Sequence, residues 1–227
     1  MSAHPSHTGS SEAVEDYAKA IYSLQRKAGG EPVTTNGLAE RLGVTPASAS
    51  AMLKRLAEQG LVDHVPYRGV QLTAAGEKLA LEVLRHHRLL ELYLVEHLGV
   101  PWDRVHEEAE ALEHVLSSDL EERIAAKLGN PVSDPHGDPI PDAQLRIHEG
   151  DTRALDSLEA GDKGIFVRVS DSDPAMLRYL GERGVGIGES FEVIERAPFE
   201  GPLTVRFPSG EHLLGGSLAA AMRVDLS

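Results

Sequence analysis

Residues 34–60 read TTNGLAERLGVTPASASAMLKRLAEQG, and they carry the most specific structural pattern in the chain. The run Thr34-Thr35-Asn36 offers an N-cap for a short helix over Gly37–Leu42. Thr45-Pro46 then supplies a capping hydroxyl and a proline at the first position of a second helix, Ala47–Gln59. Two helices joined by a short turn that contains glycine predict a helix-turn-helix.

The segments on either side extend this pattern. Residues 12–28 have apolar side chains at helical spacing and predict an amphipathic helix. Residues 61–72 hold valines and leucines around a Pro66–Gly69 turn, which predicts a two-stranded hairpin. Thr73 can cap a long helix that reaches about Leu98. This order of elements predicts a winged helix-turn-helix, and the alternatives are an ordinary three-helix domain or a winged-helix module that binds protein.

A winged helix-turn-helix places the second helix of the motif in the major groove of DNA, where its first residues face base edges. Basic side chains about two turns further on can contact phosphates, and the hairpin carries one aromatic and one basic side chain. The candidate DNA-binding residues are therefore Thr45, Ala47, Ser48, Ser50, Lys54, Arg55, Tyr67 and Arg68.

The central part of the chain continues as helix. Two further helices are expected, one over Trp102–Leu116 and one from a Ser117-Ser118-Asp119 cap to Gly129. Prolines then recur through residues 131–141, which predicts an irregular linker that begins near Asn130.

The last part of the chain changes to strand-like patterns. Four short runs separated by glycines predict a small SH3-like β-barrel. The runs are Lys163–Val169, Ser190–Ile194, Leu203–Phe207 and Met222–Val224. The predicted fold class is therefore mainly α with a β C-terminal domain, and the predicted domains are residues 1–80, 81–148 and 149–227.

The formal charge of the chain is −14, from 22 basic and 36 acidic side chains, and that number alone argues against binding to nucleic acid. The charge is uneven, because residues 1–80 have a net charge of 0, residues 81–149 of −9 and residues 150–227 of −5. Seven of the eleven histidines also lie within residues 81–149. A segment rich in carboxylate and imidazole is typical of a metal-binding region, and the alternative is a solvated acidic helix surface.

The chain contains no cysteine, which excludes disulfides, thiolate zinc sites, iron–sulfur clusters and cysteine nucleophiles. No apolar run approaches the ~18 residues of a transmembrane helix, and the first dozen residues lack the basic and apolar regions of a secretory signal. We therefore expect a cytoplasmic protein with no membrane partner, whose metal ligands are histidine, carboxylate, backbone or water.

A metal site is predicted by the run HEEAEALEH at residues 106–114. Helical spacing places Glu110, Glu113 and His114 on one face, and His106 lies one turn before Glu110 on the same side. Carboxylates this close raise one another's pKa, and a divalent ion would remove that repulsion.

A second cluster is predicted from the preceding helix, where His87 and Glu91 are again four residues apart. Antiparallel packing of the two helices would bring both of them to His106. Oxygen-rich ligands with one imidazole suit Mn²⁺ or Fe²⁺, and the sequence pattern leaves the choice between these ions open.

The chain carries, after its winged helix, RHHRLLELYL at residues 85–94, VHEEAEALEHVLS at 105–117 and GNPVSDPHGDPIP at 129–141. This order resembles the diphtheria-toxin-repressor family of metal-dependent transcriptional regulators, over essentially the whole chain after the first ten residues. The resemblance implies a homodimer that binds double-stranded operator DNA when loaded with metal and represses uptake genes. It also implies the domain roles: DNA binding for residues 1–80, metal binding and dimerisation for 81–148, and an SH3-like, iron-transport-A-like domain for 149–227.

The resemblance further implies a primary metal site of Asp16, Glu110, Glu113 and His114. Asp16 and Glu110 fall where iron-responsive members have methionine and cysteine and where manganese-responsive members have aspartate and glutamate. Both are hard oxygen donors, so the chain resembles the manganese branch, with Mn²⁺ as the co-repressor in manganese homeostasis. That branch often has a glutamate one turn after the aspartate; here the position is Lys19, which disfavours a two-ion cluster and favours a separate ancillary site.

The ancillary site that the resemblance implies comprises His87, Glu91 and His106, with Asp173 as the best match for a ligand from the SH3-like domain. Metal held by Asp16 and by the central ligands would tie the DNA-binding domain to the dimerisation domain. That link would fix the separation of the two recognition helices in the dimer, which must match successive major grooves about 34 Å apart.

Two alternatives stay open. The first is a regulator of the same fold that responds to Fe²⁺. The second is a metal-dependent hydrolase, in which the His/Glu pairs hold a catalytic ion with an open position. No convincing base or nucleophile accompanies the ligands, so we expect a regulator and not an enzyme.

Overall fold

The computed structural model describes residues 11–65, 67–199 and 201–226. The chain divides into two compact units. The first comprises Met1–His87, Leu112–Glu122 and Pro141–Arg146, and the second comprises Arg88–Ala111, Arg123–Ile140 and Ile147–Ser227. Three helices contribute to both units: α4 (Ala74–Leu98), α5 (Val105–Leu112) and α6 (Ser118–Lys127).

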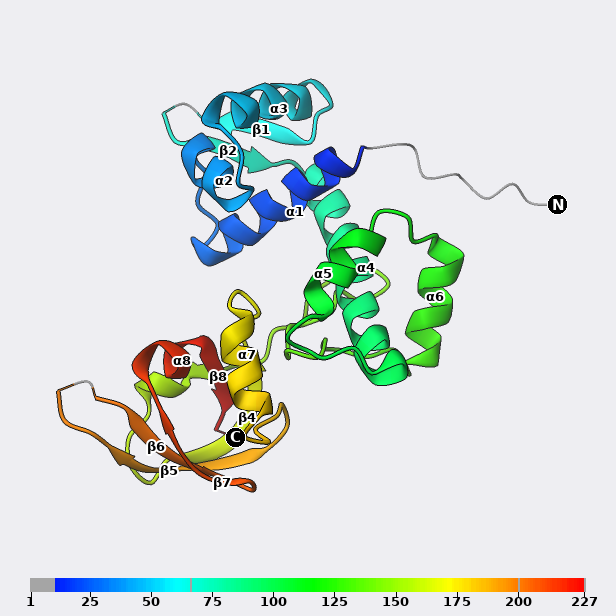
Figure 1. Ribbon diagram of the computed structural model, residues 1–227. Coiled ribbons are helices and arrows are strands. Elements are labelled where there is room, and N and C mark those ends of the chain that lie inside the picture. Colours follow the sequence, from blue (N-terminus) through cyan, green and yellow to red (C-terminus); the bar gives the residue numbers. More distant parts are fainter. Residues whose placement is uncertain (1–10, 66, 200, 227) are drawn as a thin grey trace. The chain divides into compact units, whose positions relative to one another are not determined.

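The first unit contains the winged helix-turn-helix (Figure 1). Its further elements are α1 (Glu12–Lys27), α2 (Thr35–Arg41), α3 (Pro46–Glu58), β1 (Val62–Val65) and β2 (Gly69–Leu72). The side chains of Thr34 and Thr45 cap α2 and α3, as the sequence predicts, by accepting hydrogen bonds from the backbone N–H groups of Gly37 and Ser48. The order of elements expected from the sequence is confirmed, with each helix boundary within two residues.

The hairpin of the wing is held to the rest of the first unit by its backbone. Strands β1 and β2 pair antiparallel, and an isolated bridge joins Val70 to Val33 in the segment before α2. Gly69 has a φ of 121°, and a Cβ atom there would lie 2.0 Å from the carbonyl oxygen of Val33. The wing therefore requires glycine at this position. Pro66, which the sequence places in the hairpin turn, lies outside the described residues.

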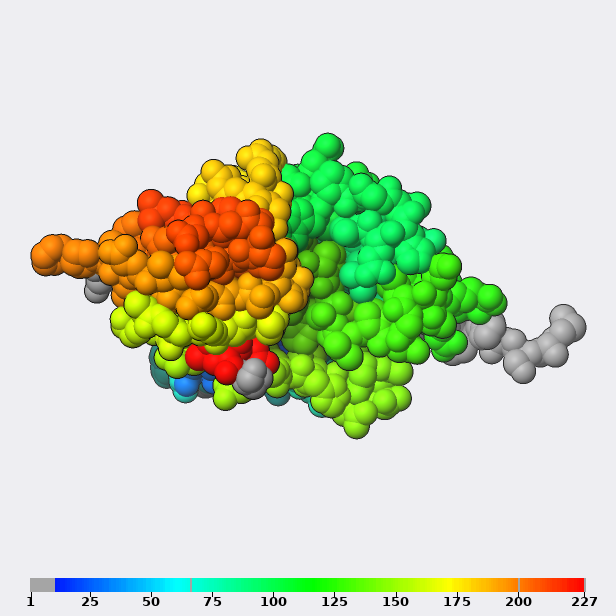
Figure 2. Space-filling view, turned by 90° about the horizontal axis from the view of Figure 1, so that it is seen from below, coloured from blue at the N-terminus to red at the C-terminus, as the bar shows by residue number. Residues whose placement is uncertain are grey.

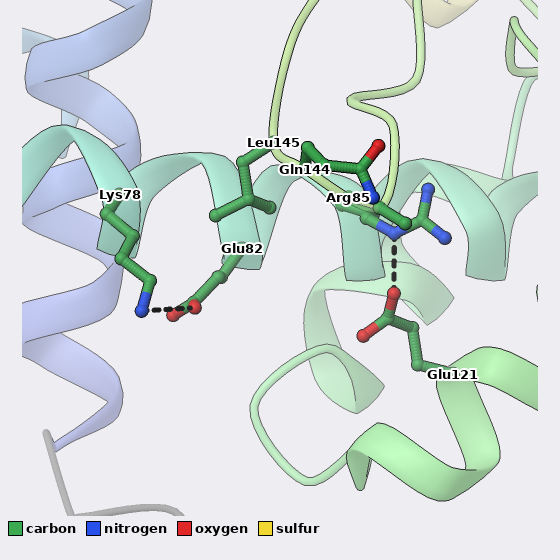
Figure 3. Close-up of a pocket in the computed structure, with 7 residues that line it drawn as sticks. Lys78, Glu82, Arg85, Glu121, Gln144 and Leu145 are labelled. Carbon is green, nitrogen blue, oxygen red and sulfur yellow. Dashed lines mark hydrogen bonds and ion pairs between the residues drawn. The ribbon is translucent and has the colours of Figure 1, made fainter.

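Within the first unit, hydrogen bonds of polar side chains join α4 to α6 and to the segment after residue 140 (Figure 3). Arg85 donates to Glu121 (2.5 Å) and to the carbonyl oxygen of Pro141 (2.6 Å), and His86 Nε2 lies 3.2 Å from the other oxygen of Glu121. Burial raises the pKa of Glu121, but the hydrogen bonds from His86 and Arg85 outweigh it and hold that pKa below its ordinary value.

The second unit is built on a six-stranded antiparallel sheet with the order β3-β8-β4-β5-β6-β7. The strands are β3 (Arg153–Ala154), β4 (Lys163–Val169), β5 (Ser190–Arg196), β6 (Leu203–Phe207), β7 (Gly210–Leu214) and β8 (Met222–Asp225). Phe166, Val205 and Met222 are fully buried in its core together with Leu177 of α7 (Pro174–Gly181). The C-terminal segment that contains this sheet is coloured from yellow-green to red in the space-filling view (Figure 2).

The prediction of a mainly α chain with a β C-terminal domain is confirmed, but the sheet is not a closed barrel. Among the described residues, β3 and β7 are the two edges and do not pair. Strand β3 has only two residues, and its neighbour in the sheet is β8. Strands β3 and β7 and helix α8 (Gly216–Ala221) were missed by the sequence analysis, because each is short and has a weak hydrophobic pattern.

Helix α5 is shorter than expected, since the sequence predicts Trp102–Leu116 and the helix spans Val105–Leu112. Trp102 leaves the helix because its ring packs against the core of the C-terminal sheet. At the other end, Glu113 and His114 lie in a turn after the helix.

The segment predicted as a linker from Asn130 is irregular, as expected, but it is packed and not a passive spacer. Asp134, His136 and Ile140 are all buried. Gly137 has a φ of 86°, and a Cβ atom there would lie 1.9 Å from a carbonyl oxygen of strand β4. Glycine therefore lets this segment lie directly on the sheet. None of the helices in the described residues is both long enough and apolar enough to cross a membrane.

The contribution of the Glu121 hydrogen bonds to the free energy of unfolding can be measured. We expect Glu121→Gln to lower the free energy of unfolding at pH 7 by about 1–3 kcal/mol, because it leaves Arg85 with a weaker partner in a mostly buried place. Since the pKa of Glu121 is lower in the folded state, its contribution is present above the unfolded pKa of about 4.3 and is lost as the pH falls through the folded value. Urea unfolding at pH 7 and at pH 3 measures both effects. Glu122→Gln, at an exposed position, is the control, and equal losses for the two variants would contradict the assignment.

Candidate metal centre and nucleic-acid interface

Helix α3 has one buried face and one exposed polar face. Its buried side chains are Ala49, Leu53 and Leu56. The exposed positions at its start and along its outer face are Thr45, Ala47, Ser48, Ser50, Lys54 and Arg55. The six positions that the sequence assigns to DNA contact on this helix therefore all lie on the accessible surface of the first unit.

The start of α3 is a fixed polar group. Thr45 Oγ1 accepts a hydrogen bond from the backbone N–H of Ser48 (3.1 Å) and lies 2.9 Å from the hydroxyl oxygen of Ser48. Two hydroxyls held in this way, with the small side chains of Ala47 and Ser50 beside them, allow close approach to a base edge.

The basic side chains of this surface have acidic neighbours. Lys54 is 80% exposed and lies 4.0 Å from Glu58, and Arg68 in the wing forms an ion pair with Glu31. Tyr67, at the tip of the wing, is fully exposed. Exposed ion pairs of this kind contribute about 0–1 kcal/mol, so they present a small barrier to a phosphate contact.

The first metal-ligand cluster lies within the first unit and joins Asp16 on α1 to Glu113 and His114 after α5. One ligand atom from each of these side chains lies within 4.8 Å of the others. His114 Nε2 is 2.9 Å from Asp16 Oδ1 and 3.5 Å from Glu113 Oε1. The Glu113 side chain has no exposed surface.

The surroundings of His114 orient it as a ligand. Its Nδ1 lies 2.6 Å from Glu15 Oε2, and a proton held there would leave the Nε2 lone pair for a metal ion bound between His114, Asp16 and Glu113. Burial by itself lowers the pKa of His114, but the hydrogen bond to Glu15 and the charges of Glu113, Asp16 and Glu15 outweigh it and raise that pKa. The sequence analysis missed Glu15, although its place next to Asp16 on an amphipathic helix is a usable signal.

Two predicted ligands belong to a different unit from the other residues of their predicted site. Glu110, assigned to the primary site, belongs to the second unit, while His87, assigned to the ancillary site, belongs to the first. Within their own units, Glu110 lies 3.6 Å from His106, and His87 Nδ1 lies 2.5 Å from Glu113 Oε2. Their places in the predicted sites stay predictions.

The second cluster lies within the second unit and is centred on Glu91, which is 1% exposed. Glu91, His106 and Asp171 form one group of possible ligands, and Glu91, Asp134 and His136 form another. His106 Nδ1 is 3.3 Å from Glu91 Oε1 and 3.7 Å from Asp171 Oδ2. The two groups share Glu91 and together offer three carboxylates and two imidazoles.

The sequence analysis missed three residues of this cluster, His136, Asp134 and Asp171, and His136 has the most specific geometry of the three. It is 1% exposed, and its Nε2 lies 2.7 Å from the carbonyl oxygen of Trp102, so Nε2 carries the proton and donates it. Nδ1 then presents a lone pair, which is buried, has no hydrogen-bond partner and lies 3.8 Å from Glu91 Oε2. A buried lone pair beside a carboxylate requires a cation or a proton between them, and this is the arrangement of a metal ligand.

The carboxylate of Asp134 belongs to the same cluster and is buried. Burial, together with the charges of Asp138 and Glu91, raises the pKa of Asp134 well above its ordinary value. Arg88 lies 3.5 Å from Asp134 and 3.6 Å from Asp138, and it offsets part of this repulsion. A bound cation would offset the rest.

Asp173, predicted as the ligand from the C-terminal domain, has a different place in the structure. It caps α7 by accepting a hydrogen bond from the backbone N–H of Ala175 (2.9 Å). Asp171, two residues earlier, is the carboxylate that reaches His106. Both residues belong to one Asp-Ser-Asp run, and the preference of aspartate for an N-cap before Pro174 separates them.

The donor sets of the two clusters have a common chemistry. Both consist of carboxylate oxygens and imidazole nitrogens without sulfur, and this combination suits hard or borderline divalent ions such as Mn²⁺ and Fe²⁺. A winged helix combined with such clusters defines a metal-responsive DNA-binding protein.

Comparisons with known proteins agree with this class. The model of the iron dependent repressor N-terminal DNA binding domain matches residues 10–70, that of the iron dependent repressor metal binding and dimerisation domain matches 73–142, and that of the FeoA domain matches 153–226. The diphtheria toxin repressor of Corynebacterium glutamicum is 30% identical over 225 residues, which cover 94% of this chain and 96% of that protein. A solved structure described as a manganese-dependent transcriptional repressor complex with manganese is 42% identical, with a TM-score of 0.83 over 94% of this chain and 100% of that one.

The chain belongs to the diphtheria toxin repressor family of metal-dependent transcriptional regulators. The iron-dependent repressor IdeR of Mycobacterium tuberculosis is 39% identical over 130 residues. That alignment spans 57% of this chain and only 56% of IdeR, a little more than half the length of that relative.

The second cluster leads to a prediction about His136. We expect His136→Ala to weaken Mn²⁺ binding at this cluster by about tenfold or more, because it removes a preoriented buried donor. Isothermal titration of the full chain with Mn²⁺ measures the change. His148→Ala, at an exposed histidine of the same unit, is the matched control, and unchanged binding by the His136 variant would contradict the ligand assignment.

The surface of α3 leads to a prediction about Lys54. We expect Lys54→Ala to weaken DNA binding similarly for all sequences and to reduce the slope of log K against log salt by about one, because one phosphate is no longer neutralised by the lysine. Binding measured by fluorescence anisotropy between low and moderate salt tests this. Lys78→Ala, on α4, should leave the slope unchanged, and an unchanged slope for Lys54→Ala would show that Lys54 contacts no phosphate.

Proposed function

We propose that this chain is a metal-dependent repressor that binds double-stranded operator DNA as a homodimer, with Mn²⁺ as its co-repressor in manganese homeostasis. The observation that carries the proposal is the convergence of Asp16, on helix α1 of the winged helix, with Glu113 and His114 from the distant turn after α5. Metal bound there supplies positive charge that both segments share.

The geometry of the first unit supports a link from this cluster to DNA. One face of α1 packs into the core that also holds α2 and α3, through Val14, Ile21, Leu38 and Leu56. Fixing Asp16 therefore fixes the position of α3 relative to Glu113 and His114. In a homodimer this would narrow the range of spacings between the two α3 helices to one that fits successive major grooves. A chain without metal samples more spacings, so its apparent affinity for DNA is lower.

The choice of Mn²⁺ over Fe²⁺ is supported by the donor atoms. Asp16, Glu113 and His114 offer oxygen and imidazole, and the chain has no cysteine to add a softer donor. The solved relative with 42% identity is described as a manganese complex, while IdeR is described as iron-dependent. Fe²⁺ therefore remains the second candidate ion, as a regulator of the same fold.

Homodimer formation is supported by apolar side chains around the turn between α5 and α6. Leu112, Val115 and Leu120 are 40%, 72% and 47% exposed. They lie within the residues that match the model of a metal binding and dimerisation domain. Exposed apolar side chains that lie together on a surface mark sites of association with other proteins. A repressor of this type acts on DNA in the cytoplasm and performs no catalysis.

The test is a gel-shift with DNA fragments from promoters of manganese transport genes. We expect tight binding with Mn²⁺, little binding with EDTA, and loss of the metal response in Asp16→Ala without loss of fold, as checked by circular dichroism. Glu12→Ala, on the first turn of the same helix, is the matched control. Equal affinity in Mn²⁺ and in EDTA would refute the proposal, and a metal response that survives Asp16→Ala would refute the primary site.

The same assay under anaerobic conditions separates the two ions. Operator binding titrated with Mn²⁺ and with Fe²⁺ should show the lower midpoint for Mn²⁺. The reverse order would assign the chain to iron.

A further inference from the structure

Lys19 occupies the first metal-ligand cluster with a positive charge of its own. It lies on α1 one turn after Asp16, and its Nζ atom is 2.5 Å from Glu113 Oε1. The Lys19 side chain is 16% exposed and that of Glu113 is not exposed at all. This ion pair is therefore mostly removed from water. Charges interact more strongly in such a place than they do in water.

The ammonium group and a metal ion compete for the same oxygen. Glu113 Oε1 is also the oxygen that faces His114 Nε2, at 3.5 Å, where a metal ion would join the two side chains. A charged ammonium group has three donors and no lone pair, so Lys19 cannot be a ligand. It acts on a bound ion only by charge and by occupying Glu113.

The charges around the cluster suit one divalent ion together with Lys19. Glu15, Asp16 and Glu113 bring three negative charges, which one divalent ion and one ammonium group balance. A second divalent ion in this cluster of the first unit would leave an excess of positive charge in a mostly buried place, which is unfavourable.

We propose that Lys19 is a built-in counter-cation, which stabilises the metal-free cluster, weakens Mn²⁺ binding there and limits the cluster to one ion. The inference rests on the proposed function, because it takes Asp16, Glu113 and His114 as the primary metal site. Lys19 thereby sets the Mn²⁺ concentration at which the chain becomes loaded.

Two opposite effects follow from removing the charge. Lys19→Met keeps most of the apolar stem but leaves the buried Glu113 facing other carboxylates, so the metal-free chain should lose stability. The same change removes the repulsion of a bound ion, so Mn²⁺ should bind about tenfold more tightly, which corresponds to about 1.4 kcal/mol. A residue with a merely structural role would lower stability without tightening metal binding.

The experiment uses the full chain and Mn²⁺ alone as the probe. Free Mn²⁺ is measured by its electron paramagnetic resonance signal during titration, and unfolding by urea is followed in EDTA. We expect Lys19→Met to bind more tightly and to unfold at lower urea, and Lys19→Arg, which keeps the charge, to bind like the unaltered chain. Lys78→Met, at an exposed lysine of the same unit, should change neither quantity.

The outcomes test the role of Lys19 separately from the assignment of the primary metal site. Unchanged or weaker Mn²⁺ binding by Lys19→Met overturns the role of Lys19, as does equal tightening by Lys19→Arg. Tightening that persists in a double variant with Asp16→Ala also overturns it, because the effect would then arise elsewhere. If Asp16→Ala alone leaves the titration unchanged, the proposed primary site itself is wrong.

Discussion

The burial of Glu113 is the constraint on which the first unit is organised. A carboxylate without solvent contact must be neutralised, and here its two oxygens face Lys19 on α1 and His87 on α4, each at 2.5 Å. The three segments that meet at this carboxylate are distant in sequence, so one buried charge fixes the position of α1 relative to α4 and to the turn after α5. A site of this kind is sensitive to cations, because the same electrostatic demand can be met by an ammonium group, a protonated imidazole or a metal ion.

The second unit contains a similar buried carboxylate, Glu91. Its carboxylate lies among His106, His136, Asp134 and Asp171, and the first three of these come from helix and from the packed segment before the sheet. Burial, together with the charges of Asp138 and Glu91, raises the pKa of Asp134, so its surroundings oppose the ionisation of this carboxyl group. Repulsion of this kind within the buried group of Glu91, Asp134 and His136 is a feature of functional sites more than of structural ion pairs, which place opposite charges together.

The sequence predicts the winged helix well because every local signal agrees with it. The caps Thr34 and Thr45, the glycines after each helix and the apolar spacing all point to the same elements. The first cluster could also be predicted from the sequence. Helical spacing indicates Glu113 and His114, and the family resemblance indicates Asp16. In contrast, Lys19 contacts Glu113 only through tertiary packing, and no periodicity connects residues 94 positions apart.

The packed segment around His136 shows a different limit. Its prolines and glycine correctly exclude helix and strand, but composition does not tell an exposed linker from an irregular segment that lies on a sheet. The distinguishing features are a glycine whose Cβ would collide with strand β4 and a histidine whose ring is held by the carbonyl of Trp102. Both features depend on partners that are remote in sequence, as does the approach of Asp171 to His106.

The distribution of charge indicates how metal can influence DNA binding. A bound ion adds only two positive charges to a chain with a formal charge of −14. The ligands Asp16, Glu113 and His114 lie on α1 and in the turn after α5, so none of them belongs to the exposed face of α3. At physiological ionic strength the Debye length is about 8 Å, so a direct attraction to phosphates farther from the ion than this is largely screened. The neutral N-terminal segment already approaches DNA without net repulsion, and the contribution of metal must therefore be geometric: it holds α1 to Glu113 and His114 and so restricts where α3 can be.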